Sequence, residues 1–568
     1  MLSVENLLAG VGRPLHVEHG YASRTAERRF TVGPRSMALA TAAATTLTCS
    51  RLIGETADRH EHEESRMSEK FFDAVRASIG GDAVDVSDGA RARYGHNRLP
   101  GGDRRPAGVL SPASTEQVAA IVRLAGEHGV TLWPTSTGHN FGLGEFSPVR
   151  AGQVVVHLGR RMNRILEVDE RLGYAVVEPG VTFRQLRAEL AAHGDTFMLS
   201  ATSGPPDGSI LGNALDRGAG YTPYFDHFGM LCGLEVVLPD GGVLHTGDGT
   251  LAGSRNRFVN KSGFGPLLDG LFSQSNYGIV TQAAIWLMPR PPVIRAFAFE
   301  FPEDDDLAEI IELVRPLKLT NAVPTLVKVT SDVYGFATER PYPYERTGGA
   351  VPLPDAVRRE LQAEHHTGAW LVSGALYGPT EQAVAPGIDR LRALFEGTGG
   401  AGKVTYHAHE QMLENPVHKI HVDTFSGEPT DRELGLLDWR PGGGATWFLP
   451  ATPMVGEVAQ LQQRTSRRIL AEHGFEYAVE FVCGPRAARA LHIVLFDRSD
   501  AGEVARMDAA YDELVAAYDR LGYPIGRTPT DRQEWAMRRQ PELRRLTSEI
   551  KSALDPNGIL APGKYGID

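Results

Sequence analysis

The chain has 568 residues, of which 42% are hydrophobic and 23% are charged. These proportions are typical of a soluble globular protein and argue against a disordered or membrane-embedded chain. The length predicts two or three folded units with cores large enough to enclose a cofactor. The formal net charge of −12 argues against a nucleic-acid-binding protein, which normally carries a basic surface, and fits a small substrate.

Cysteine usage predicts a reducing compartment, and hence a cytoplasmic protein, because Cys49, Cys232 and Cys483 are too few and too far apart for a disulfide framework. An alternative is export, because Arg28-Arg29 precedes a short apolar run at 37–49, as in a twin-arginine signal. That run is too short to span a membrane. We interpret residues 1–66 as a disordered leader or a non-native start, because folded-looking periodicity begins only at Met67.

The first part of the chain predicts alternating helices and strands. Apolar residues at helical spacing indicate a helix over 71–79, and Ser114 is a typical N-cap for a helix over 114–126. Short apolar runs bounded by Gly, Asp or Pro indicate strands. These strands are expected at 108–110, 130–134, 154–158, 175–178 and 234–238.

A proline cluster at 287–293 indicates a boundary, after which a second region of mixed strands and helices begins. Three aspartates at 304–306 favour a helix over 304–314, because acidic residues stabilise helix N-termini. Further strands are predicted at 296–301, 369–373, 445–449 and 478–482, and further helices at 501–521 and 540–554. The fold class is therefore predicted to be α+β.

No metal site is predicted. The histidines at 407, 409, 418 and 421 do not have the spacing of a tetrahedral ligand set. The chain also lacks a Gly-x-Ser-x-Gly elbow and a Gly-x-Gly-x-x-Gly loop after a strand, which argues against a hydrolase and a Rossmann dehydrogenase.

Two glycine-rich loops are candidates for binding a diphosphate. The loop 134–144 follows a predicted strand and combines three glycines with hydroxyl side chains, and the segment 208–223 is similarly rich in Gly and Asn. Glycines permit close backbone approach, and successive N–H and hydroxyl groups donate to anionic oxygens.

These two loops, the turn 177–183, the segment 272–280 and the tail 555–566 resemble the vanillyl-alcohol oxidase and 4-cresol dehydrogenase family of flavoproteins. The resemblance extends from Val84 to Asp568. It implies a two-subdomain FAD-binding fold with an α+β cap domain, and FAD as the cofactor. The implied domains are an FAD-binding domain over 67–290, a cap over 291–515 and a C-terminal segment over 516–568 that returns to the flavin.

The loops and the resemblance together predict the residues that bind FAD. They are Pro134, Ser136, Thr137, Gly138, His139, Asn140, Gly142, Gly208, Ser209, Gly212, Asn213, Asp216, Gly220, Tyr221, Gly278, Ile279, Val280, Arg527 and Lys564.

The resemblance implies oxidation of the para side chain of a phenol, with hydride transfer from the benzylic carbon to flavin N5 through a quinone methide. Relatives bind the phenolate with two tyrosines and an arginine, and the matching residues here are Leu143, Gly526 and Arg527. An arginine favours the ionised phenol. Without the two tyrosines, the pocket is expected to suit a larger or less acidic substrate.

Three further residues are candidates for the catalytic site. Glu480 matches an acidic residue of the relatives' active-site wall. Asp207 lies three residues after the position of a proton-handling aspartate, although Asp before Gly is also common in turns. Arg489 replaces a histidine and is a candidate substrate contact.

Relatives often bond the flavin to a tyrosine or a histidine, and the matching residues here are Leu437 and Ala445. Neither side chain can form that bond. The resemblance therefore implies non-covalent FAD.

Two alternatives stay open: an FAD enzyme acting on a different, bulkier substrate such as a natural-product intermediate, and a catalytically silent flavoprotein. The electron acceptor is either O2 or an unidentified acceptor, so oxidase and dehydrogenase are both open. Expected partners are a small aromatic substrate and further copies of the chain, as a homodimer or higher oligomer, with no nucleic acid and no membrane.

Overall fold

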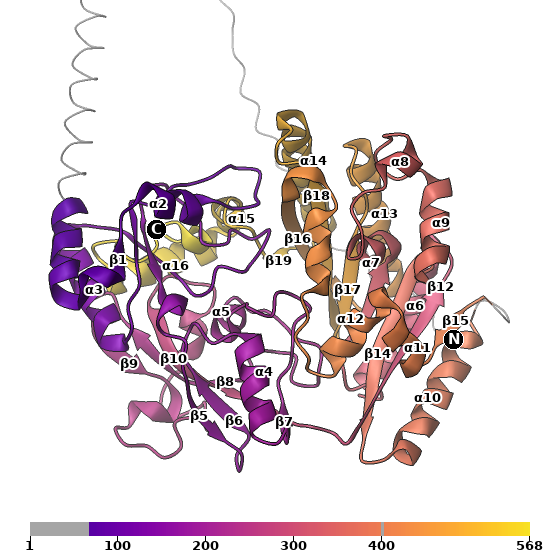
Figure 1. Cartoon of the computed structure of the whole chain (residues 1–568), viewed down its shortest axis with the longest axis horizontal. Coiled ribbons are helices and arrows are strands. Elements are labelled where there is room, and N and C mark those ends of the chain that lie inside the picture. The colour runs from indigo at the N-terminus through magenta and orange to yellow at the C-terminus, as the bar shows by residue number, and fades with distance from the viewer. Residues whose placement is uncertain (1–67, 399–402) are drawn as a thin grey trace, which may run out of the picture. The chain divides into compact units, whose positions relative to one another are not determined.

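The computed structural model describes residues 68–398 and 403–568. The predictions made for residues 1–66, the export signal included, lie outside the described residues. A helix over 68–79 opens the described chain, in agreement with the helix predicted over 71–79. Three larger β-sheets and their helices follow (Figure 1).

The first sheet has four strands in the order β1-β2-β4-β3: β1 (Val84–Asp85), β2 (Gly108–Leu110), β4 (Val154–His157) and β3 (Leu132–Thr135). Strands β2 and β3 both run parallel to β4. Helix α3 (Thr115–His128) connects β2 to β3, and the Ser114 side chain accepts a hydrogen bond from the Gln117 amide at its N-terminus. The carboxyl ends of β3 and β4 therefore lie side by side, and the glycine-rich loop leaves from β3.

The second sheet has five antiparallel strands in the order β5-β6-β10-β8-β9. They are β5 (Ile165–Asp169), β6 (Tyr174–Val177), β10 (Ile279–Trp286), β8 (Leu231–Val237) and β9 (Val243–His245). Two helices, α4 (Phe183–Ala192) and α5 (Ile210–Leu215), share a hydrophobic core with this sheet. The second glycine-rich segment includes α5.

The third sheet has eight antiparallel strands in the order β15-β12-β14-β13-β17-β18-β16-β19. The strands are β15 (Thr405–His407), β12 (Val293–Phe301), β14 (Trp370–Gly378), β13 (Val327–Ser331), β17 (Val479–Cys483), β18 (Ala487–Phe496), β16 (Gly444–Pro453) and β19 (Ile525–Arg527). Four helices share the core on one of its faces: α6 (Leu307–Leu319), α10 (Glu381–Glu396), α13 (Gly456–Glu472) and α14 (Ala501–Leu521).

The opposite face of the eight-stranded sheet faces the candidate site. Because side chains alternate along a strand, the residues between the core positions of β17 and β18 point to this face. They include Glu480 and Val482 on β17 and Arg489, Leu491 and Ile493 on β18.

The C-terminal segment returns to the first sheet after α15 (Gln533–Arg538) and α16 (Pro541–Leu554). The Leu132 amide donates to the Ile559 carbonyl, and the Ala561 amide donates back to the Leu132 carbonyl. Figure 1 accordingly shows the yellow C-terminal segment among the indigo elements. The short turn η8 (Lys564–Gly566) then reaches the site.

The predicted α+β class is confirmed, and the predicted strands and helices recur with shifts of a few residues at their ends. Strands β13 and β18 and helix α13 were not predicted. The domain boundaries at 290 and 515 stay predictions.

Candidate active site

A cavity of about 660 Å³ lies where segments of all three sheets meet. It takes in both glycine-rich loops, residues 278–280 before and within β10, the inner face of β16 to β19, and η8. Its volume lies within the range of typical cofactor and ligand pockets.

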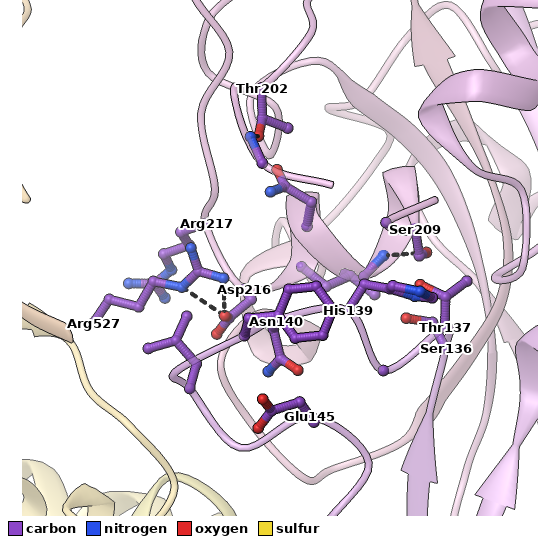
Figure 2. Close-up of a pocket in the computed structure, with 18 of the residues that line it drawn as sticks. Ser136, Thr137, His139, Asn140, Glu145, Thr202, Ser209, Asp216, Arg217 and Arg527 are labelled. Atoms are coloured by element: carbon purple, nitrogen blue, oxygen red, sulfur yellow. Dashed lines mark hydrogen bonds and ion pairs between the residues drawn. The ribbon is translucent and has the colours of Figure 1, made fainter. Parts of the chain in front are cut away.

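The loop after β3 forms one wall. Gly138 has φ +69°, and a Cβ there would lie 2.5 Å from the Phe146 ring, so the backbone needs glycine at this position. The Thr135 hydroxyl and His139 Nδ1 are buried without a hydrogen-bond partner among the described residues. Figure 2 shows Ser136, Thr137 and His139 facing the same region. These polar groups on the cavity wall are therefore available to bind a ligand.

The second glycine-rich segment meets this loop. A Cβ on Gly212 would lie 2.4 Å from Ser136 Oγ, so glycine allows the two loops to touch. The Ser209 hydroxyl accepts from the Gly212 amide at 2.8 Å and donates to the Pro179 carbonyl at 2.6 Å. The predicted cofactor-binding residues that line the cavity are Pro134, Ser136, Thr137, Gly138, His139, Asn140, Gly208, Ser209, Gly212, Asn213, Asp216, Tyr221, Gly278, Ile279, Val280, Arg527 and Lys564.

Two predicted cofactor residues lie behind the wall instead. A Cβ on Gly142 would lie 2.9 Å from the Trp447 ring, and one on Gly220 would lie 2.2 Å from Ser200 Oγ. Both glycines therefore serve packing of the loops. Neither residue lines the cavity, and their contact with the cofactor stays a prediction.

An ion pair joins the C-terminal strand β19 to the second loop. Arg527 Nε donates to the Asp216 carboxylate at 2.6 Å, and the Tyr565 hydroxyl donates to the other carboxylate oxygen at 2.9 Å. Figure 2 shows Arg527 reaching Asp216 beside Arg217. Lys564 Nζ lies 3.4 Å from the Pro134 carbonyl, and burial lowers its pKa. Arg527 is thus paired with Asp216, whereas Arg217 and Lys564 form no ion pair with a carboxylate of the described residues.

Glu480 does not line the cavity. Its carboxylate is fully buried and accepts hydrogen bonds from the Tyr221 hydroxyl at 2.9 Å and the Thr330 hydroxyl at 3.0 Å. Lys328 Nζ, also fully buried, lies 3.3 Å from it. Tyr221, which lines the cavity, donates to Glu480, so Glu480 reaches the cavity through Tyr221 and its catalytic role stays a prediction.

Sequence reasoning missed Glu433, which does line the cavity. The Tyr334 hydroxyl donates to its carboxylate. Burial, together with the charge of Glu480, raises the pKa of Glu433 to about 7, although Lys328 and hydrogen bonds from Ser203 and Tyr334 oppose the rise. The Ser203 and Tyr221 hydroxyls are 2.9 Å apart, so a chain of hydrogen-bonding groups links Glu433 to Glu480. The only sequence signal was that Glu433 lies four residues before Leu437.

Glu145 is a second cavity carboxyl that the sequence did not reveal. Burial raises its pKa to about 7. The Arg98 amide donates to it at 3.3 Å and the Arg98 guanidinium lies 3.5 Å away, so this carboxyl is tied to the protein.

Asp207 points away from the cavity. It pairs with Arg184 at 2.9 Å, and the pair holds the pKa of Asp207 below its usual range. More than half of both side chains is exposed. Asp207 is not among the residues that line the cavity, and its role in proton transfer stays a prediction.

Apolar side chains form a further part of the cavity wall. Leu143, Gly526 and Leu437 line the cavity, whereas Ala445 is fully buried behind it. The same part of the wall includes Trp447, Leu449, Leu491 and Ile493.

The histidines at 407, 409, 418 and 421 have separate partners. His407 contacts Glu300, His418 contacts the His366 carbonyl, and His421 contacts Ser373. Among residues 68–398 and 403–568, no group of three or more metal-ligating side chains is close enough to hold a metal. Within the same ranges, no helix has the length and apolar character needed to cross a membrane.

Two family models match the chain. An FAD binding domain matches residues 106–247, and the C-terminal domain of FAD linked oxidases matches residues 457–565. A 4-cresol dehydrogenase [hydroxylating] flavoprotein subunit from Pseudomonas putida is 37% identical over 88% of this chain and 95% of its own. The chain belongs to the vanillyl-alcohol oxidase and 4-cresol dehydrogenase family of FAD-linked oxidoreductases.

Two further relatives support this assignment to the family. A 1'-carboxy-chondrochloren decarboxylase from Chondromyces crocatus is 33% identical over 88% of this chain and 97% of its own. A crystal structure of p-cresol methylhydroxylase with substrate bound has a TM-score of 0.85 and 36% identity, over 88% of this chain and 97% of that one. The predicted family fold, the FAD cofactor and an oxidoreductase activity are thereby confirmed.

Proposed function

We propose that this oxidoreductase oxidises the para side chain of a 4-substituted phenol by removing a hydride from the benzylic carbon, which leaves a quinone methide. The observation that carries the proposal is that a single cavity is lined by all the groups this reaction needs. Flavin-type loops, the Arg527 guanidinium, an apolar wall and the Glu433 carboxyl all open into it. The similarity to a 4-cresol dehydrogenase flavoprotein subunit supports the same substrate class.

FAD, when bound, supplies the hydride acceptor at its N5 atom. The glycine-rich loops would hold its diphosphate, because their buried hydroxyl and imidazole groups lack protein partners and their glycines permit close approach. Lys564 and Arg217 would neutralise negative charge there, since both line the cavity and neither forms an ion pair with a described carboxylate.

Arg527 would favour the phenolate form of the substrate. Asp216 already accepts from its Nε and a terminal nitrogen, so the guanidinium is held in place by its partner. Because Asp216 fixes the guanidinium, the remaining N–H donors of Arg527 also have fixed directions. A cation held in this way stabilises a phenolate through charge-assisted hydrogen bonds.

Glu433 is the proposed proton acceptor in place of Asp207. A water that adds to the quinone methide must lose a proton, and a carboxylate whose pKa is near 7 suits that task at neutral pH. Lys328 keeps the neighbouring Glu480 paired, so the two acids have different roles: Glu480 orients Tyr221, and Glu433 titrates.

The FAD is proposed to be dissociable. Leu437 lines the cavity and Ala445 is buried, and neither side chain has a nucleophilic atom. Acid precipitation of the loaded protein should release all yellow colour into the supernatant. A yellow pellet would contradict this proposal, and His139, a histidine that lines the cavity, would then be the residue to replace.

The substrate test is anaerobic mixing of the FAD-loaded protein with vanillyl alcohol and a series of 4-alkylphenols. Loss of the yellow flavin absorbance with at least one of them is expected. If none bleaches the flavin although the protein holds it, the phenol assignment fails.

A different, bulkier substrate is the second candidate, and the positions of Leu143 and Gly526 favour it. Both line the cavity where relatives have tyrosines, so the cavity has lost two hydroxyl groups and, at Gly526, a whole side chain. The similarity to a decarboxylase named for a carboxylated compound also fits a different substrate. Bleaching by such a compound, with none by simple alkylphenols, would favour this candidate.

We also propose that the chain divides at 290 and 515 into an FAD domain, a cap and a C-terminal segment. The proposed electron acceptor is O2 or another acceptor, and the proposed assembly is a homo-oligomer. A cytoplasmic location is supported by Cys232 and Cys483, which are free, buried thiols.

A further inference from the structure

Arg489 faces the cavity from the middle of the eight-stranded sheet. It lies on β18 opposite Val482 of β17 and Ala451 of β16, and all three residues line the cavity. Leu491 and Ile493 follow it on the same face at two-residue spacing. A guanidinium group therefore stands in an otherwise apolar part of the wall.

The guanidinium has one hydrogen bond to the protein. Nη1 donates to the Arg217 carbonyl at 2.7 Å, and no carboxylate of the described residues forms an ion pair with it. An arginine has five N–H donors, so most of those of Arg489 have no protein acceptor. Arg527 differs, because Asp216 already accepts from it.

Placing the charged Arg489 guanidinium here costs electrostatic free energy unless an anion binds beside it. Burial and the nearby Arg527 and Arg217 lower the pKa of Arg489, although the guanidinium itself is open to the cavity. The charges of Asp226 and Asp216 only partly oppose this lowering of the pKa. Arg489 and Arg527 contact adjacent residues of the second loop, Arg217 and Asp216, so the two cations approach the cavity together. A negatively charged group between them would relieve their repulsion.

The FAD diphosphate is not the expected anion. The loops that suit a diphosphate come from the first and second sheets, whereas Arg489 stands on the third sheet, between the apolar residues Val482 and Ala451 of the neighbouring strands, and contacts the second loop only through the Arg217 carbonyl. These side chains belong to the wall that the proposed function assigns to the substrate.

We infer that Arg489 forms a carboxylate subsite, and that the substrate is an aromatic compound carrying a carboxylate in addition to its oxidised side chain. The inference rests on the proposed function for the rest of the site. The carboxylate would accept hydrogen bonds from the free Arg489 donors, while Leu491 and Ile493 contact the apolar part of the molecule.

The test compares matched ligands on the FAD-loaded protein without oxygen, after its flavin has been reduced with dithionite so that no ligand can transfer a hydride to it. The probes are 4-ethylphenol and two carboxylated counterparts, 5-ethylsalicylate and 3-(4-hydroxyphenyl)propanoate. Dissociation constants come from calorimetry, and bleaching of the oxidised flavin by the same probes is measured separately. At least one carboxylated probe should bind more tightly than 4-ethylphenol, and Arg489→Met should reduce that preference by about 10- to 100-fold, the usual value of a hydrogen bond to a charged group.

Arg489→Lys is the matched control, because it keeps the charge and should retain part of the preference. Equal weakening of all three ligands by Arg489→Met, or no weakening of any, would overturn the inference. A loss of FAD affinity with an unchanged carboxylate preference would also overturn it and assign Arg489 to the cofactor. Because binding is measured without turnover, an Arg489-dependent preference with no flavin bleaching would refute the phenol oxidation and leave the carboxylate subsite standing.

Discussion

Replacing Glu433 by Gln isolates the cost of keeping an ionisable group in the cavity wall. The fold raises the pKa of this carboxyl from 4.5 to about 7. A raised carboxyl pKa means that the unfolded chain releases its proton at lower pH than the folded protein. The free energy of unfolding therefore falls as the pH rises from about 4.5 to about 7.

The size of this effect follows from the shift. Each pKa unit corresponds to 1.36 kcal/mol, so the wild type loses about 3 kcal/mol of stability across that interval. Glutamine keeps the shape and an oxygen that accepts from the Tyr334 hydroxyl, but it does not ionise. We expect Glu433→Gln to gain stability relative to the wild type by about 3 kcal/mol between pH 4.5 and pH 8.

The assay is chemical denaturation of the FAD-loaded wild type and variant at several pH values, followed by single-turnover flavin reduction and product analysis in the same buffers. The variant should also slow the proton-dependent step, and the pH dependence near 7 should disappear. Glu480→Gln is the control: its carboxylate is paired with Lys328, so it should destabilise the protein at every pH in this range. A stability difference between wild type and Glu433→Gln that does not change with pH would refute the reasoning.

Three other perturbations test separate parts of the site. Lys328→Met leaves buried Glu480 without its cation and should cost about 3 to 5 kcal/mol in denaturation experiments; it should also raise the pKa of Glu433 seen in the pH profile, and wild-type behaviour in both would count against the pairing. Gly138→Ala places a Cβ against the Phe146 ring at positive φ and should weaken FAD binding about tenfold or more in a fluorescence titration, whereas an unchanged dissociation constant would remove this loop from the cofactor site. Asp207→Asn breaks only an exposed ion pair, so stability should change by about 1 kcal/mol at most, and a large loss of flavin reduction rate would restore Asp207 as the proton acceptor.

The strands that precede the cofactor loops could be predicted because residues next to them in the sequence mark where they begin and end. Ser114 caps its helix, and the glycines after β3 have the positive φ that the loop requires. Strand β18 was missed because its residues Ala487–Phe496 include Arg489 and His492, which interrupt the apolar pattern.

The roles of the acidic residues depended on contacts distant in sequence. The pKa of Glu433 depends on Ser203, Lys328 and Tyr334, which come from three separate parts of the chain. Glu480 was found by resemblance, but only the packing of Tyr221 shows that it lies behind the cavity. The sequence around Asp207 also suggested a catalytic role. In the structure its carboxylate pairs with Arg184 instead.

The central claim is that a hydride leaves the benzylic carbon of a phenol bound in this cavity. The most direct measurement is the rate at which a bleaching phenol reduces the flavin in a single turnover without oxygen, compared with the same phenol carrying deuterium only at the benzylic carbon. If the benzylic hydride is transferred to the flavin, bleaching should be slower with the deuterated compound, and the product should be an alcohol or alkene derived from the quinone methide. Equal rates together with a product unchanged at the benzylic carbon would contradict this claim.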